Sequence, residues 1–167
     1  IVESRNKPLC NVPQMIYGNK PADGGALIIE DYDYKKFVES APAAKKFIKP
    51  LLGATEYING KKRWCLWLVG ASPEEIRKIP LIMERVQQCK IAREKSIAAG
   101  IRKFAATPTL FAQRTQPTDK DFIIVPRVSS QNRKYIPIGF IKAGTIVTDR
   151  VQIIPDATLY DFGVVIS

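Results

Sequence analysis

The stretch SPEEIRKIPLIMERVQQCKIAREKSIAAGIRKF, residues 72–104, is the longest helical pattern in the sequence. It begins with a capping box, because Ser72 is a preferred N-cap residue, Pro73 suits the first helical position and Glu75 lies three residues after the cap. Pro80 ends this helix and begins a second one. The apolar face of the second helix has mostly three- and four-residue spacing and comprises Ile82, Val86, Cys89, Ile97, Ile101 and Phe104. A short helix followed by a long one is therefore predicted.

Strand-like runs lie on both sides of this helical stretch. From residue 121 onward the periodicity is that of β-strands, although Pro126 and Pro137 restrict two runs to sheet edges or bulges. Upstream, Asn59-Gly60 between β-prone runs is a strong hairpin signal. The predicted strands, about seven, are residues 26–29, 56–58, 63–69, 122–128, 135–141, 151–154, and 158–160 with 162–166. The fold expected is α+β, a mixed, largely antiparallel sheet with a long basic helix and a helical hairpin packed on it.

The first 25 residues have no regular period, because prolines and the Asp23-Gly24-Gly25 turn interrupt it. We expect an irregular segment over residues 1–25, either an ordered approach segment or a linker, and one domain over residues 26–167. Inside that domain, apolar spacing over residues 37–48 predicts a helix whose regularity Pro42 limits.

The chain of 167 residues is 46% hydrophobic and 25% charged, a composition that supports a folded core. Its net charge of +10 is concentrated in the middle, with net charges of +1 over residues 1–60, +7 over 61–103 and +2 over 104–167. A local excess of this size suits a polyanion, since contacts with phosphates release condensed counterions. On charge alone, nucleic acid, an acidic membrane surface and an acidic protein remain alternatives, as does a solvated helix face.

The sequence contains no histidine, which excludes Ser-His-Asp and Cys-His catalysis and most zinc sites. Its three cysteines, Cys10, Cys65 and Cys89, lack CxxC spacing and indicate a reducing, intracellular compartment. Cys65 and Cys89 lie in apolar patterns and are predicted to be buried structural thiols. No apolar run approaches the ~20 residues of a membrane span. The first residues resemble neither a signal peptide nor a translation start, so we expect a fragment of a longer protein.

One enzymatic alternative survives the lack of histidine. Asp33-Tyr34-Lys35, with Asp23 or Glu30 upstream, could form a small magnesium-dependent nuclease site, because carboxylates suit Mg²⁺ and a lysine can orient water. Such triplets are common by chance, and a surface turn is the simpler interpretation. A phosphate-cradling glycine motif is absent from the sequence.

A recognition pattern lies between two predicted strands. Gln131, Asn132 and Arg133 are consecutive and carry the paired donors and acceptors that match base edges, arginine with guanine and the amides with adenine. Arg127, Ser129, Ser130 and Lys134 flank them and are suited to phosphates. The alternative is an ordinary polar loop. Together with the basic middle segment, the pattern favours nucleic acid.

Five blocks of the sequence carry a resemblance to a known family, namely residues 47–50, 53–68, 72–77, 124–130 and 133–140. In this order they resemble the target recognition domain of MmeI-like single-chain restriction–modification enzymes. Residues 11–15 and 23–25 resemble the link from a methyltransferase domain, and residues 154–160 resemble a later block. The similarity covers nearly the whole chain.

The resemblance implies a parent enzyme with a metal-dependent nuclease domain, an adenine methyltransferase domain using S-adenosylmethionine, and this recognition domain without catalysis or cofactor of its own. It implies base readout by Ser130, Gln131, Asn132 and Arg133, led by Gln131 and Arg133. The expected partners are double-stranded DNA and the other two domains, and the expected location is the cytoplasm. Readout would position a target adenine for flipping into the methyltransferase pocket. The predicted DNA-backbone contacts are Lys61, Lys62, Arg63, Arg127, Ser129 and Lys134. An RNA- or acidic-protein-binding module remains an alternative.

Overall fold

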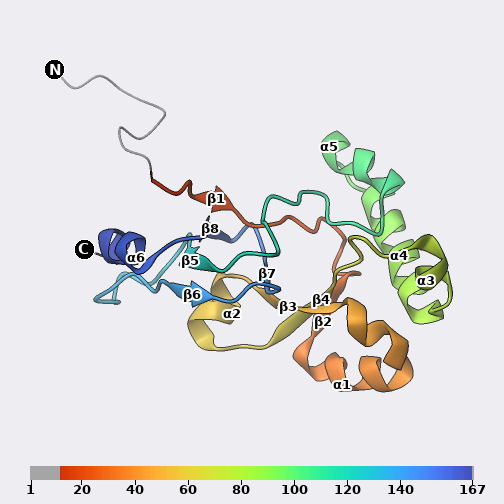
Figure 1. Cartoon of the computed structure of the whole chain (residues 1–167). Helices are drawn as coiled ribbons and strands as arrows, with labels where there is room; N and C mark the ends of the chain where they lie inside the picture. Colours follow the sequence, from red (N-terminus) through yellow and green to blue (C-terminus); the bar gives the residue numbers. More distant parts are fainter. Residues whose placement is uncertain (1–11, 167) are drawn as a thin grey trace.

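Short strands form two four-stranded sheets in the computed structural model, which describes residues 12–166 (Figure 1). The first sheet has the order β1-β8-β5-β6, and all its neighbouring strands are antiparallel. These strands are β1 (Ile16–Tyr17), β5 (Phe122–Pro126), β6 (Gly139–Ile141) and β8 (Val151–Pro155). Ile124 pairs with Ile153 at the centre, and both are fully buried in an apolar cluster. The β-branched runs of the C-terminal third form this sheet because their apolar side chains pack on one another.

The second sheet has the order β2-β4-β3-β7. Its strands are β2 (Ile28–Glu30), β3 (Ile48–Leu52), β4 (Arg63–Leu66) and β7 (Ile146–Val147). Only the β3–β7 pairing is parallel among the paired strands described. Because β7 belongs to this sheet and β8 to the first, residues 148–150 carry the chain directly from one sheet to the other.

Helices cover the second sheet and gather at one end of the molecule (Figure 1). They are α1 (Asp31–Ser40), the 3-10 helix η1 (Pro42–Phe47), α3 (Pro73–Arg77) and α4 (Pro80–Glu94). Ile76, Ile82 and Val86 of α3 and α4 pack in one core with Ile29 and Leu66 of the sheet. The capping box is confirmed, since Ser72 Oγ accepts the Glu75 N–H at 3.2 Å and the Ser72 N–H donates to Glu75 Oε2 at 3.2 Å. The α+β prediction is therefore confirmed, with the strands divided between two sheets.

The predicted hairpin at residues 56–69 is wrong in its first half. Residues 54–59 form helix α2 (Ala54–Asn59), and only β4 is a strand. Gly60 has φ +64° and ends α2 in the left-handed conformation. Asn-Gly signals positive φ, which a helix C-terminus uses as readily as a hairpin turn does.

The predicted strands over residues 158–166 are also wrong, because this segment is helix α6 (Leu159–Ile166). Its first turn is capped reciprocally, since Thr158 Oγ1 accepts the Asp161 N–H at 3.3 Å while Asp161 Oδ2 accepts the Thr158 N–H at 2.7 Å. Phe162 stacks on Phe140 with ring centroids 5.5 Å apart, which holds α6 against β6. The β-branched residues of this segment favoured a strand, whereas the Thr158–Asp161 spacing is a capping signal that favours a helix.

Two further predicted elements are shorter than expected. The strand over residues 135–141 is reduced to β6, and Tyr135 and Ile136 are exposed. The long helix ends at Glu94 and is followed by the short helices α5 (Ala99–Arg102) and η2 (Lys103–Ala106). Ile97, predicted on the apolar face, is 99% exposed.

A buried arginine explains why the long helix ends early. Arg93 is fully buried on the last turn of α4, and its guanidinium donates five hydrogen bonds of 2.7–2.9 Å to backbone carbonyls. The carbonyls belong to Pro21, Ala22, Phe104, Thr107 and Leu110. The chain must turn back after α4 to bring these groups around the guanidinium.

Part of the predicted irregular segment is integrated into the fold. Residues 1–11 lie outside the described part of the chain. β1 is an edge strand of the first sheet, and the Asp23 carboxylate accepts the N–H groups of Gly25 at 3.1 Å and Leu27 at 2.6 Å. Buried Asn19 donates to the Gln116 side chain at 2.9 Å and to the Val147 carbonyl at 3.2 Å. The domain boundary at residue 26 stays a prediction.

Candidate nucleic-acid interface

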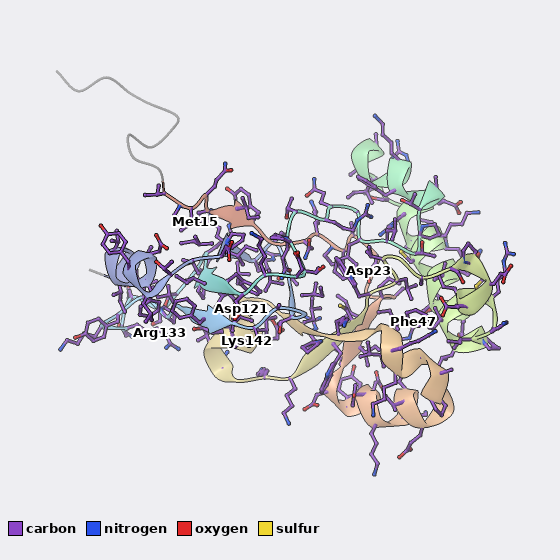
Figure 2. All side chains as sticks on the ribbon, in the orientation of Figure 1. Met15, Asp23, Phe47, Asp121, Arg133 and Lys142 are labelled. Carbon is purple, nitrogen blue, oxygen red and sulfur yellow. The ribbon has the colours of Figure 1, made fainter. Side chains whose placement is uncertain are left out.

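The loop between β5 and β6, residues 127–138, contains the longest run of exposed residues in the described part of the chain. Every residue from 127 to 136 is exposed, and the loop extends at the end of the molecule that carries α6 (Figure 1). Arg133 lies at this end, away from α3 and α4 (Figure 2). β5 and β6 are antiparallel neighbours with Ile124 opposite Gly139, so a rigid sheet anchors both ends of the loop.

A turn brings the four predicted base-reading residues together. The Arg133 N–H donates to the Ser130 carbonyl at 3.1 Å, and the Asn132 N–H donates to Ser130 Oγ at 3.2 Å. The Ser130 side chain thus holds the turn, a local bond typical of serine. Gln131 and Asn132 consequently occupy its tip.

The side chains of Gln131, Asn132 and Arg133 make no hydrogen bond or ion pair with any residue between 12 and 166. Each carries several donors or acceptors that a bound molecule can use. An arginine fork and two amides on an exposed turn can pair with base edges that present adjacent donors and acceptors.

The flanks of the loop differ in how they are held. Lys134 Nζ lies 5.4 Å from the centre of the Tyr135 ring, and Ser129 is exposed. Arg127 is fixed by the link between β7 and β8, because its N–H donates to the Arg150 carbonyl at 3.3 Å and its Nη1 to the Asp149 carbonyl at 3.2 Å. Its Cζ lies 5.3 Å from the centre of the Tyr17 ring.

A groove of about 750 Å³ runs between the two sheets and reaches the start of the loop. We call it the basic groove, because four of its lining side chains are basic. They are Lys20, Arg63, Arg127 and Arg150. Glu56 and Asp149 are its acidic lining residues. The structure therefore brings the predicted Arg63 and Arg127 together, and adds two residues that sequence reasoning missed.

Arg63 is less available than the prediction assumed. Its guanidinium lies between two carboxylates, with Nη2 2.7 Å from Glu30 Oε1 and Nη1 3.2 Å from Glu56 Oε1. Lys61 and Lys62 follow α2 on the exposed link to β4 and do not line the basic groove. The DNA-backbone role of these three residues stays a prediction.

Other arginines of the basic middle segment also have partners inside the chain. Arg85 Nη1 donates to the carbonyls of Ala26 at 3.0 Å and Ile28 at 2.8 Å, and Arg102 Nη1 donates to those of Ser96 and Ile97 at 2.8 Å each. Arg93, which is fully buried, does the same. Part of the positive charge in the middle segment therefore belongs to arginines that hydrogen-bond the protein's own backbone.

Three of the four residues of the nuclease alternative, Asp23, Glu30 and Lys35, have partners within the described chain. Asp23 caps the turn at residues 25–27, Glu30 pairs with Arg63, and Lys35 Nζ lies 4.0 Å from Glu39. Among residues 12–166, no group of three or more acidic or cysteine side chains is arranged to hold a metal ion.

Cys65 and Cys89 are free and fully buried, which confirms them as buried thiols. Desolvation by burial raises the pKa of Cys65 strongly, reinforced by the negative charge of Asp23. Burial likewise raises the pKa of Cys89 to about 11, against a lowering by Arg93. Cys10 lies outside the described residues. Within those residues, no helix has the length and apolar character needed to cross a membrane.

Comparison with known proteins gives three consistent matches. The family model described as "MmeI, target recognition domain" matches residues 1–167. "DNA methyltransferase A" of Bacillus subtilis (strain 168) is 41% identical over 167 residues, 100% of this chain and 19% of the relative. A solved structure of the type IIL restriction–modification enzyme MmeI in complex with DNA matches with a TM-score of 0.93 and 39% identity, over 98% of this chain and 22% of that one. The chain therefore spans about a fifth of the length of these relatives, and the resemblance inferred from its sequence is confirmed.

Proposed function

This chain belongs to the family of MmeI target recognition domains, and we propose that it reads the base sequence of duplex DNA through the β5–β6 loop. The single observation that carries the proposal is the set of unpartnered polar side chains at Gln131, Asn132 and Arg133 on an exposed turn. Side chains that already satisfied one another would have to break those bonds before they could pair with bases. These three have no such bonds to break among residues 12–166.

Readout proceeds from the major groove in this proposal. That groove is about 12 Å wide and presents a distinct donor and acceptor pattern for each base pair. A loop on a two-stranded support can enter it, with Gln131 and Asn132 suited to adenine and Arg133 to guanine. Each good bidentate pair discriminates against a wrong base by about 1–3 kcal/mol. The Ser130 turn stabilises the loop, which lowers the entropy cost of ordering it on DNA.

The parent enzyme supplies the chemistry. We propose that recognition by this domain positions a target adenine for flipping into a methyltransferase domain and positions the DNA for cleavage by a nuclease domain. S-adenosylmethionine and Mg²⁺ would be bound by those domains in the cytoplasm, and the chain described here would have no catalytic role of its own.

The test is selection of a randomised duplex library by the chain, followed by the same selection with Gln131→Ala and Arg133→Ala. We expect each variant to lose preference at one or more base positions by about 1–3 kcal/mol while overall affinity falls modestly. Lys134→Ala is the matched control, since loss of a phosphate contact weakens all sequences alike.

Two outcomes would overturn the proposal. One is a wild-type chain that selects no sequence. The other is a pair of variants that discriminate as the wild type does. Competition by RNA and heparin at matched salt completes the test, because stronger competition by either one than by duplex DNA would favour a different polyanion.

A further inference from the structure

We propose that the basic groove holds phosphates of one DNA strand beside the β5–β6 loop, with Lys20 and Arg150 as phosphate-contacting side chains alongside Arg127. This inference rests on the proposed function, because it names where the backbone of the recognised duplex lies. Lys20 and Arg150 stand far from Arg127 in the sequence, and the fold brings all three to one groove.

The backbone that carries these three basic residues is held by hydrogen bonds. The Asp149 N–H donates to the Asn19 carbonyl at 2.9 Å, and the Arg127 N–H donates to the Arg150 carbonyl at 3.3 Å. Lys20 and Gln113 exchange two backbone bonds of 3.0 and 3.1 Å. The backbone positions from which the three side chains extend are consequently set before any ligand binds, which favours binding because little backbone ordering remains.

The basic side chains of the groove differ in availability. Arg63 is paired with two carboxylates, and Arg127 donates a hydrogen bond from Nη1 to the Asp149 carbonyl. Lys20 and Arg150 are exposed, and their side chains make no hydrogen bond or ion pair with the described residues. Lysine and arginine with free donors are the usual phosphate partners.

Two carboxylates limit the positive potential of the groove. Glu56 is occupied, because it accepts the Gly53 N–H at 2.8 Å and pairs with Arg63. The Asp149 carboxylate has no partner among residues 12–166 and lines the same groove as Lys20 and Arg150. A phosphate entering the groove meets this one uncompensated negative charge, so its removal should favour binding.

The groove lies where a DNA strand would be needed. Arg127 and Val128 line it and are also the first residues of the β5–β6 loop. A loop that enters a major groove is flanked by phosphates, and contacts with them fix its register on the duplex. Lys20, Arg127 and Arg150 line the groove as three separate cations, which suits successive phosphates of one strand more than a single free anion.

The experiment measures the affinity of the chain for a duplex over a range of salt concentrations. Each phosphate contact contributes roughly 0.9 to the slope of log Kobs against log salt, so Lys20→Ala/Arg150→Ala should lower that slope by roughly 1.8. Lys36→Ala/Lys45→Ala removes the same charge from exposed sites on α1 and η1 and should leave the slope nearly unchanged. Asp149→Asn should strengthen binding at low salt.

The groove and the reading loop can fail separately. If the Lys20/Arg150 variant folds and keeps the wild-type slope while Arg133→Ala still loses base preference, the groove assignment is wrong and the proposed function stands. If base preference is absent from the wild type, both fail. If the Lys20→Ala/Arg150→Ala chain keeps the wild-type salt slope for the duplex but no longer binds inorganic phosphate, the groove is a free-anion site and the strand assignment is overturned.

Discussion

The C-terminal end of α4 and the β5–β6 loop each present an arginine, and the two are used in opposite ways. Arg93 is fully buried and gives its five donors to backbone carbonyls, whereas Arg133 is exposed and gives none to the described residues. Both count equally toward the net charge of +10. The arginines of a basic protein therefore fall into two groups, those that hydrogen-bond its own backbone and those that remain available to a partner.

The largest effect should follow from replacing the buried member of the pair. Arg93→Met removes the donor of five partly buried carbonyls, and each one that water cannot reach costs about 1–3 kcal/mol. The free energy of unfolding should fall by at least about 3 kcal/mol, measured by urea denaturation. Arg133→Ala is the control and should change it by no more than about 0.5 kcal/mol. Equal stability losses in the two variants would end the comparison.

A charge-preserving change at the exposed member should have a smaller effect, on binding alone. Arg133→Lys keeps the positive charge but loses the planar fork that pairs with guanine. Base preference should weaken by about 1–3 kcal/mol in library selection, with an unchanged salt slope. A lysine variant that discriminates as well as the wild type would reduce Arg133 to a phosphate contact.

The smallest effect belongs to an intermediate case. Arg102 is exposed, yet its Nη1 donates to the carbonyls of Ser96 and Ile97, just beyond the end of α4. Because water can replace these bonds, Arg102→Ala should lower the free energy of unfolding by no more than about 1 kcal/mol and leave base preference intact. Altered base preference in this variant would place part of the readout at the helical end of the molecule.

The sequence predicted the parts of the fold that local chemistry determines. Ser72 and Pro80 marked two helix starts correctly, and the apolar run at residues 122–126 is a strand. Asn59-Gly60 was wrongly predicted to be a hairpin turn, because residues with positive φ end helices as readily as they form hairpin turns. Residues 158–166 misled because β-branched composition outweighed the cap formed by Thr158 and Asp161. That spacing is visible in the sequence and could have identified the helix.

The site was predictable only where its residues are adjacent along the chain. Ser130 to Arg133 form one local turn, so a sequence pattern could identify them. Lys20 and Arg150 share a groove through pairing between distant segments, which no local pattern reveals. The sequence also could not show which arginines are already hydrogen-bonded within the chain, because the partners of Arg93 lie 11 to 72 positions away.

The most direct test of the account is an NMR titration of the arginine side-chain N–H signals with a duplex that the chain selects. The Arg93 signal should exchange slowly with water and keep its position, because the guanidinium is buried among carbonyls. The Arg133 signal should exchange quickly without DNA, then shift and become protected when the duplex binds. A shifted Arg93 signal beside an unchanged Arg133 signal would contradict the account.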